Sequence, residues 1–335
     1  MKVGVLLFGL ILTLAPCVSA ATDPSMARLE QQLELLSRTT DAVVGVSALH
    51  IESGRYVSVR GTEQFPQASA VKVPIAVQIM ALADEGKLSL GKIVTLKPAD
   101  LHPGSGRISE LLFHPGVALS IENIMELAIV VSDNSAADLM LREAGGPAAV
   151  TERMKILGLS GIRVDRSIAV LLADWGGIKT LPPEAEWNRD MWDKLFDAVP
   201  EAEHMAARRL GTHDPRDTAT PADMTRLLAR IWKRDLFSPV YATKMLDVME
   251  RCQTGKTRIK GMLPAGTDVA HKTGTMGGVV NDVGIITLPG KAGHVALSVF
   301  TKGSYRPEEV SEKTVAEISR TIYDYFALVP AEGRP

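Results

Sequence analysis

The sequence has little cysteine, no excess of basic residues and no transmembrane segment after its first twenty residues. Its 335 residues include two cysteines, Cys17 and Cys252. The formal net charge is −2 and the sequence pI is about 6.4, which argues against a surface for nucleic acid or a polybasic membrane tail. The seven histidines are scattered and form no His-x-His or His-x-x-x-His pair. Because zinc hydrolases need such pairs, we expect no metal and no cofactor.

The first twenty residues are typical of a secretory signal peptide. Lys2 precedes a short apolar stretch over residues 3–15, and small residues follow up to Ala20. The apolar stretch is too short to span a bilayer comfortably, so we expect an exported protein, periplasmic or secreted. A buried N-terminal helix and a lipoprotein signal at Cys17 are the alternatives, although the proline before Cys17 disfavours the second. Cleavage after Ala20 or the next alanine leaves Cys252 alone, without an intramolecular disulfide.

The rest of the chain predicts an α+β fold with an antiparallel sheet. Strand patterns at both ends enclose a mainly helical middle, and an amphipathic helix is expected at each end. We expect a sheet lobe from residues 22–66 and 222–329 and a helical lobe from residues 67–221, with a cleft between them. The expected strands cover residues 43–51, 56–60, 268–274, 283–288 and 294–301.

A serine and a lysine lie three residues apart at the start of an apolar helical pattern. On a helix, Ser69 and Lys72 share one face, so the amine can orient or deprotonate the hydroxyl. Taken alone, the pair is also compatible with a helix-capping serine and a lysine whose amine reaches solvent. The helix over residues 69–85 is apolar almost all round, which predicts burial on every side. A buried lysine has a lowered pKa, which favours the catalytic interpretation.

Two further polar motifs follow. Ser132-Asp133-Asn134 interrupts a helical pattern, where it is also compatible with a helix-capping cluster. Lys272-Thr273-Gly274 ends a strand pattern, where a lysine also serves to protect an exposed sheet edge. Each motif alone is weak evidence. Their joint occurrence, in this order and in these structural contexts, is a strong signal.

The three motifs together resemble the signature of class A β-lactamases and penicillin-binding proteins. The surrounding sequence is similar as well: Phe65-Pro66 before the first motif, Thr254-Gly255 before Arg258, and Asn281-Asp282 after the third. The resemblance covers about residues 24–166 and 214–329. It implies the α+β fold of that family and, as substrate, a β-lactam or a peptidoglycan stem peptide.

The resemblance implies a role for each residue of the first two motifs. Ser69 becomes acylated, Lys72 activates it, and Ser132 passes a proton to the leaving nitrogen. Asn134 holds the side-chain amide of the substrate. The backbone N–H groups of Ser69 and Thr275 form the oxyanion hole.

The third motif is implied to bind the substrate. Lys272 and Thr273 bind the carboxylate shared by penicillins and peptide termini, and Gly274 and Thr275 continue the same strand. Arg258 stands where some members of the family carry a second carboxylate-binding arginine. The alternative for Arg258 is an ordinary surface arginine.

The sequence departs from the family at the step that releases the acyl group. Class A enzymes hold the hydrolytic water with a glutamate and an asparagine, and Ile168 and Leu172 stand at these positions here. The short loop is replaced by a long segment over residues 167–216, which we expect to be partly helical. Glu184 or Glu186 is a candidate substitute base, although acids in such a segment are usually solvated.

Three functions remain open at this point. The first is a β-lactamase, and the second is a DD-peptidase or penicillin-binding protein with slow deacylation. The third is a sensor that stays acylated, which the lack of a later transmembrane segment disfavours. We expect a monomer.

Overall fold

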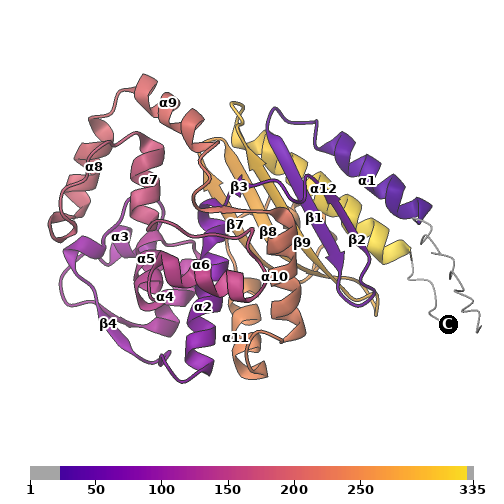
Figure 1. The fold of residues 1–335 in the computed structure, drawn as a ribbon, viewed down its shortest axis with the longest axis horizontal. Helices are drawn as coiled ribbons and strands as arrows, with labels where there is room; N and C mark the ends of the chain where they lie inside the picture. Colours follow the sequence, from indigo (N-terminus) through magenta and orange to yellow (C-terminus); the bar gives the residue numbers. More distant parts are fainter. Residues whose placement is uncertain (1–22, 330–335) are drawn as a thin grey trace, which may run out of the picture.

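The computed structural model describes residues 23–329 and contains a five-stranded sheet beside a group of helices (Figure 1). The predicted signal peptide lies outside the described residues. All neighbouring strands pair antiparallel, in the order β2-β1-β9-β8-β7. The strands are β1 (Val43–His50), β2 (Tyr56–Val59), β7 (Val269–Met276), β8 (Val279–Thr287) and β9 (His294–Lys302). The predicted α+β class and all five predicted strands are confirmed.

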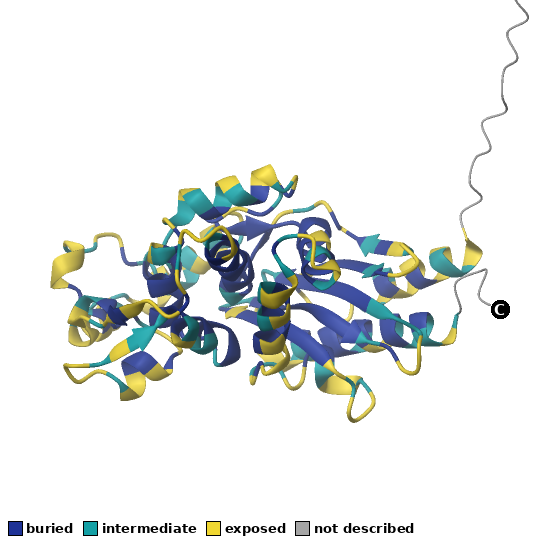
Figure 2. Cartoon of the chain, turned by 90° about the horizontal axis from the view of Figure 1, so that it is seen from below, coloured by how far each residue is buried: buried dark blue, intermediate teal, exposed yellow. Residues whose placement is uncertain are grey.

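Helices cover both faces of this sheet. The terminal helices α1 (Pro24–Leu36) and α12 (Glu308–Leu328) lie side by side on one face, and α10 (Pro221–Lys233) packs on the other (Figure 1). Figure 2 shows the strands buried along most of their length. Because both faces of the sheet are covered, successive residues of β1, β8 and β9 are buried, and burial does not alternate along these strands.

The first helix begins as its sequence predicts. Asp23 caps it by accepting a hydrogen bond from Ser25 N at 2.9 Å, and Pro24 occupies the first turn, where its missing N–H costs nothing. Leu29 and Leu33 are buried against the sheet. The Ser25 hydroxyl also lies 2.6 Å from the hydroxyl of Tyr325, which joins the two terminal helices.

The helical group is built around α2 (Lys72–Asp84), in which every residue from Lys72 to Ala81 is buried. The predicted burial on all sides is therefore confirmed. The helix begins at Lys72 rather than at Ser69, because the residues before it form the 3-10 turn η1 (Ala68–Val71). The other helices of this group are α3 (Arg107–Leu111), α4 (Ile121–Val130), α5 (Asn134–Glu143), α6 (Pro147–Ile156) and α11 (Pro239–Glu250). The division into two lobes stays a prediction.

Most of the long segment over residues 167–216 is helical, as expected. It contains α7 (Ile168–Gly176), the 3-10 turn η3 (Glu184–Glu186), α8 (Arg189–Asp197) and α9 (Glu201–Gly211). Trp187 anchors it to the helical group, with its ring edge-on to His102 at a centroid distance of 5.9 Å. No helix within residues 23–329 has the length and hydrophobicity needed to cross a membrane.

A two-stranded pairing brings the end of this segment to the first motif. Strand β3 (Phe65–Pro66) pairs with β6 (Thr218–Ala219), so residues far apart in sequence meet just before Ser69. A second short hairpin joins β4 (Ile93–Thr95) to β5 (Ala118–Ser120). The sequence pattern predicted neither pairing.

Candidate active site

Ser69 lies in a strained turn at the base of the buried helix. Residues three apart are eclipsed in a 3-10 turn, so Ser69 and Lys72 lie on the same face of η1 and the start of α2. Ala68, just before the serine, has φ of +46°, a left-handed conformation that residues with a Cβ rarely adopt. Ala68 and Ala70 are buried, whereas Ser69 is half-buried. The turn therefore leaves the serine open to solvent where its neighbours are enclosed.

Lys72 is fully buried and is held by the second motif. Its Nζ donates hydrogen bonds to Ser132 O at 2.6 Å, to Ser132 Oγ at 3.2 Å and to Asn134 Oδ1 at 2.9 Å. Burial, and next the positive charge of Lys272, hold the pKa of Lys72 well below its usual range. A lysine that loses its proton easily is suited to act as a base.

Ser132 occupies the break between α4 and α5, with φ of +61°. Asp133 fixes this break: its Oδ1 accepts a hydrogen bond from Ala136 N at 2.8 Å, and its Oδ2 accepts one from Ile108 N at 2.7 Å. Asp133 is thus the N-cap of α5, so the predicted capping role of this motif is confirmed. The two other residues of the motif, Ser132 and Asn134, contact Lys72.

Lys272 reaches the same hydroxyl from strand β7. Its Nζ donates a hydrogen bond to Ser132 Oγ at 2.9 Å, so this oxygen accepts from both lysines. Burial is the main cause that lowers the pKa of Lys272 to about 8, and the charge of Arg258 acts in the same direction. The charges of Cys252 and Asp282 raise this pKa and oppose the shift. The alternative in which Lys272 is a solvated edge-strand residue is wrong, because its side chain is fully buried.

Gly274 lets β7 lie directly against the turn that carries Ser69. A Cβ on this residue would lie 3.2 Å from Ser69 N, 3.0 Å from Ala70 N and 2.5 Å from Gln67 O. Any larger residue would push the strand away from the serine. Asn281 of β8 supports the same turn, because its Nδ2 donates hydrogen bonds to Pro66 O at 2.9 Å and to Gln67 O at 3.0 Å.

Arg258 lies behind β7 and is only 4% exposed. Its guanidinium donates hydrogen bonds to Thr275 Oγ1 at 2.7 Å and to Gly274 O at 3.2 Å, and it forms an ion pair with Glu312 of α12 at 3.0 Å. The alternative of an ordinary surface arginine is therefore wrong. Arg258 holds the end of the strand in place, and direct binding of a carboxylate by this residue stays a prediction.

A segment that the sequence analysis missed lies against Asn134. The Asn134 Nδ2 donates a hydrogen bond to Pro103 O at 3.0 Å, and its backbone N–H donates one to Ser105 O at 2.9 Å. Ser105 Oγ in turn donates to Ser132 O at 3.2 Å. A Cβ on Gly104, where φ is +81°, would lie 2.8 Å from Asn134 Nδ2, so glycine is required there. The cluster of turn residues around Gly104 is the only sequence signal for this contact.

The first turn of α7 also lies beside the site, and its side chains are apolar. Asp138, one helical turn after Asn134, accepts hydrogen bonds from Ile168 N at 2.6 Å and from Ala169 N at 2.9 Å. Ile168 is 5% exposed, and Leu172 packs against Ala68 next to the serine. Neither side chain can accept a proton from water.

The two candidate substitute bases lie on η3. Glu184 and Glu186 are both exposed, and within residues 23–329 neither forms an ion pair with Lys72 or Lys272. Their proposed catalytic role stays a prediction that no contact supports.

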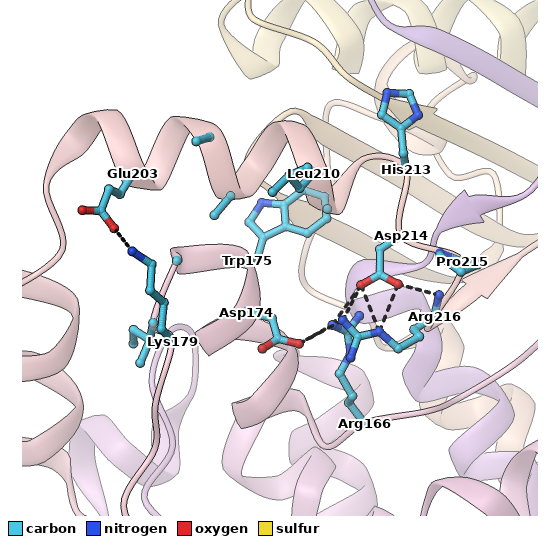
Figure 3. Close-up of a pocket in the computed structure, with 15 residues that line it drawn as sticks. Arg166, Asp174, Trp175, Lys179, Glu203, Leu210, His213, Asp214, Pro215 and Arg216 are labelled. Atoms are coloured by element: carbon cyan, nitrogen blue, oxygen red, sulfur yellow. Dashed lines mark hydrogen bonds and ion pairs between the residues drawn. The ribbon is translucent and has the colours of Figure 1, made fainter.

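A cavity of about 880 Å³ lies between α7, α9 and residues 213–216, away from the three motifs (Figure 3). Arg166 lies at one end, with ion pairs to Asp174 at 2.6 Å, Asp214 at 3.2 Å and Asp217 at 2.6 Å. These ion pairs join the two ends of the long segment. Within residues 23–329, no cluster of three histidine, cysteine or acidic side chains has the geometry of a metal site.

The similarity to known proteins covers almost all of the described residues. A model of the β-lactamase enzyme family matches residues 28–326. The chain belongs to the class A β-lactamases. Its relatives include β-lactamase VEB-1 of Pseudomonas aeruginosa, which is 27% identical over 92% of each chain. The carbapenem-hydrolyzing β-lactamase KPC of Klebsiella oxytoca is 29% identical over 83% of this chain and 82% of its own.

Solved class A structures share the fold. The TLA-1 extended-spectrum β-lactamase superposes with a TM-score of 0.73 at 27% identity, covering 90% of this chain and 99% of its own. A β-lactamase from Chitinophaga pinensis gives a TM-score of 0.72 at 26% identity, covering 89% and 98%. The resemblance that the three motifs predicted is thus confirmed, and the enzyme is a β-lactamase-family hydrolase.

Proposed function

We propose that this enzyme hydrolyses β-lactams through an acyl-enzyme on Ser69. The observation that carries the proposal is the position of Ser132 Oγ, which accepts hydrogen bonds from Lys72 at 3.2 Å and from Lys272 at 2.9 Å. Two buried lysines that share one hydroxyl beside a half-buried serine form a proton path from nucleophile to leaving group. Family membership supports the same reaction.

Acylation begins with transfer of the Ser69 proton to Lys72. Burial, and next the charge of Lys272, lower the pKa of Lys72, which makes its amine the candidate base for that proton. Ser132 then delivers a proton to the nitrogen that leaves when the lactam ring opens. Lys72 and Lys272, both in contact with Ser132 Oγ, can replace the proton that it gives up.

The third motif orients the substrate. The Lys272 ammonium and the Thr273 hydroxyl form an electropositive edge for the β-lactam carboxylate. Backbone N–H groups of Ser69 and Thr275 are proposed to stabilise the oxyanion, an interaction worth about 3 kcal/mol per donor in the transition state. The close packing of Gly274 on Ser69 N supports this arrangement.

We propose that deacylation is slow. Ile168 and Leu172 occupy the first turns of α7, where Leu172 packs against the cluster that contains Ala68, and neither side chain can activate water. General-base assistance typically accelerates such a step by about 10²- to 10⁴-fold, so its loss leaves the acyl-enzyme long-lived. The same property would suit a penicillin-binding or DD-peptidase role on a peptidoglycan stem peptide.

Rapid mixing with a chromogenic β-lactam tests both parts of the proposal. We expect a burst of about one product per enzyme, followed by a slower steady rate. No burst and no turnover by folded protein would contradict the acyl-enzyme. Fast turnover without a burst would contradict slow deacylation.

We also propose that the protein is exported and acts as a monomer outside the cytoplasm. The charge, apolar stretch and small residues over residues 1–20 support export. The substrate is small, and the motifs meet within one chain, so a single copy supplies the whole proposed site.

A further inference from the structure

A cysteine, a histidine and an aspartate form a buried row behind strand β7. Cys252 follows α11, His271 precedes Lys272 on β7, and Asp282 lies on the neighbouring strand β8. Their exposed fractions are 7%, 0% and 0%. His271 Nδ1 lies 2.9 Å from one carboxylate oxygen of Asp282 and 3.1 Å from the other. The contact favours a proton on Nδ1 and stabilises a positively charged ring.

The other ring nitrogen of His271, Nε2, is buried as well. Within the described residues, the buried Nε2 has no hydrogen-bond partner of ordinary geometry, yet the ring is close enough to Cys252 to shift its pKa. Burial alone raises the pKa of the Cys252 thiol, but His271, Lys272 and the Thr254 hydroxyl together lower it to about 6. Burial lowers the pKa of His271, but Asp282 and then Cys252 raise it to about 9. Both shifts favour a thiolate beside an imidazolium near pH 7.

The row is connected to the proposed carboxylate site. Cys252 Sγ lies 3.3 Å from Thr254 Oγ1, which lies 2.6 Å from Thr273 Oγ1. The thiol therefore supports the hydroxyl of Thr273 through a single intermediate residue. Its negative charge also favours the protonated form of Lys272, the next residue after His271.

We propose that Cys252 is a positioning residue for substrate capture: its thiolate, paired with His271 and Asp282, orients Thr254 and Thr273 and keeps Lys272 protonated. The inference rests on the proposed binding of the substrate carboxylate by Lys272 and Thr273. The cations His271, Lys272 and Arg258 all lie around β7. Asp282 contacts His271 and Glu312 pairs with Arg258, and Cys252 is the further acidic group whose charge acts on His271 and Lys272. A buried cysteine that only filled space would have a thiol pKa at or above the ordinary value of about 8.5, because burial disfavours the thiolate.

Three substitutions separate charge from size. Cys252→Ser keeps the hydroxyl-sized contact with Thr254 but removes the charge, Cys252→Ala removes both, and Cys252→Asp restores a negative charge. The first readout is the absorbance of thiolate at 240 nm, taken as the difference between wild-type protein and Cys252→Ser across pH, so that any signal from Cys17 cancels. We expect a midpoint near 6.

The second readout is the pH profile of the second-order rate constant for acylation by a carboxylate-bearing β-lactam. Loss of a neighbouring negative charge lowers the pKa of Lys272, so the alkaline limb of Cys252→Ser and Cys252→Ala moves to lower pH. A shift of one pH unit corresponds to about tenfold slower acylation on that limb. Cys252→Asp is expected to hold the limb near its wild-type position.

A thiol midpoint at or above about 8.5, or alkaline limbs that stay in place in both uncharged variants, would overturn the proposal. Failure of wild-type protein to become acylated would instead contradict the proposed function, and it would be seen before any variant is compared. If Cys252→Ala does not fold, the near-isosteric Cys252→Ser still gives both readouts.

Discussion

Ser132 is the residue at which the three motifs meet. Its hydroxyl lies 3.2 Å from Lys72 Nζ and 2.9 Å from Lys272 Nζ, although the three residues come from a helix start, a helix break and a strand. Burial lowers the pKa values of both lysines. The charge of Lys272 adds to the effect on Lys72, and the charge of Arg258 adds to the effect on Lys272. Lys72 is thereby suited to accept a proton, and Lys272 binds an anion only while its ammonium stays charged.

The alkaline limit of substrate capture follows from Lys272. Its pKa is lowered to about 8, so the side chain is a cation below that pH and becomes neutral above it. We expect the acylation rate constant for a carboxylate-bearing β-lactam to fall as pH rises through about 8. Lys272→Arg, which stays charged, is expected to lose this limb even if its overall rate is lower. If wild-type protein and Lys272→Arg show the same alkaline limb, the limb reports the titration of another group.

Ile168 gives a gain-of-function test of the missing base. Ile168→Glu places a carboxylate at the position where the family holds its hydrolytic water, so the steady-state rate after the burst is expected to rise about tenfold or more. Ile168→Gln is the matched control, since it has the same size and polarity without basicity. Steady-state turnover of a chromogenic β-lactam is the measurement. Equal rates in the two variants would show that the carboxylate does not act as a base.

Among the elements, α7 is held at its first turn by a carboxylate of α5. Asp138 accepts two backbone hydrogen bonds from the first turn of α7 and lies 2.7 Å from His102 Nδ1. Such contacts satisfy N–H groups that a helix start otherwise leaves without partners. The position of Ile168 and Leu172 beside the site is therefore set by Asp138.

Asp138→Ala is expected to destabilise the fold by about 3 kcal/mol, because it leaves two backbone N–H groups without acceptors in a buried region. Urea unfolding measures the change. Asp138→Asn keeps one acceptor oxygen and is expected to lose about half as much. A loss below about 1 kcal/mol in Asp138→Ala would mean that other groups position α7.

The local elements were largely predictable from sequence, and the contacts between them were not. Hydrophobic periodicity reports which face of a segment is buried, and it located the five strands and both terminal helices. It does not report which distant segments meet, so the β3–β6 pairing and the contact between Asp138 and α7 were missed. The helix start was placed at Ser69 because a 3-10 turn has nearly the same periodicity as the helix it precedes.

For the molecule as a whole, the motifs predicted the family and the converging residues, because their chemistry is specific. The pairing of Cys252 with His271 could not be predicted, because the two residues lie 19 positions apart, one on β7 and the other after α11. Arg258 was left open between two roles, and its buried ion pair with Glu312 of the terminal helix needed the fold to be seen. Long-range contacts of this kind depend on how distant segments of the chain pack against one another.

Export is a prediction for the whole chain. Expression of the full sequence in a Gram-negative host is expected to give periplasmic protein whose first residue follows Ala20 or Ala21. Intact mass of the purified protein measures the cleavage site. Protein that keeps residues 1–20 and stays in the cytoplasm would contradict the prediction.

The most direct test of the acyl-enzyme is intact mass spectrometry after brief exposure to a β-lactam. We expect a mass increase equal to one whole β-lactam, on the peptide that contains Ser69, which decays slowly and is absent from Ser69→Ala. A covalent adduct of the same mass on the Ser69→Ala protein would contradict the account.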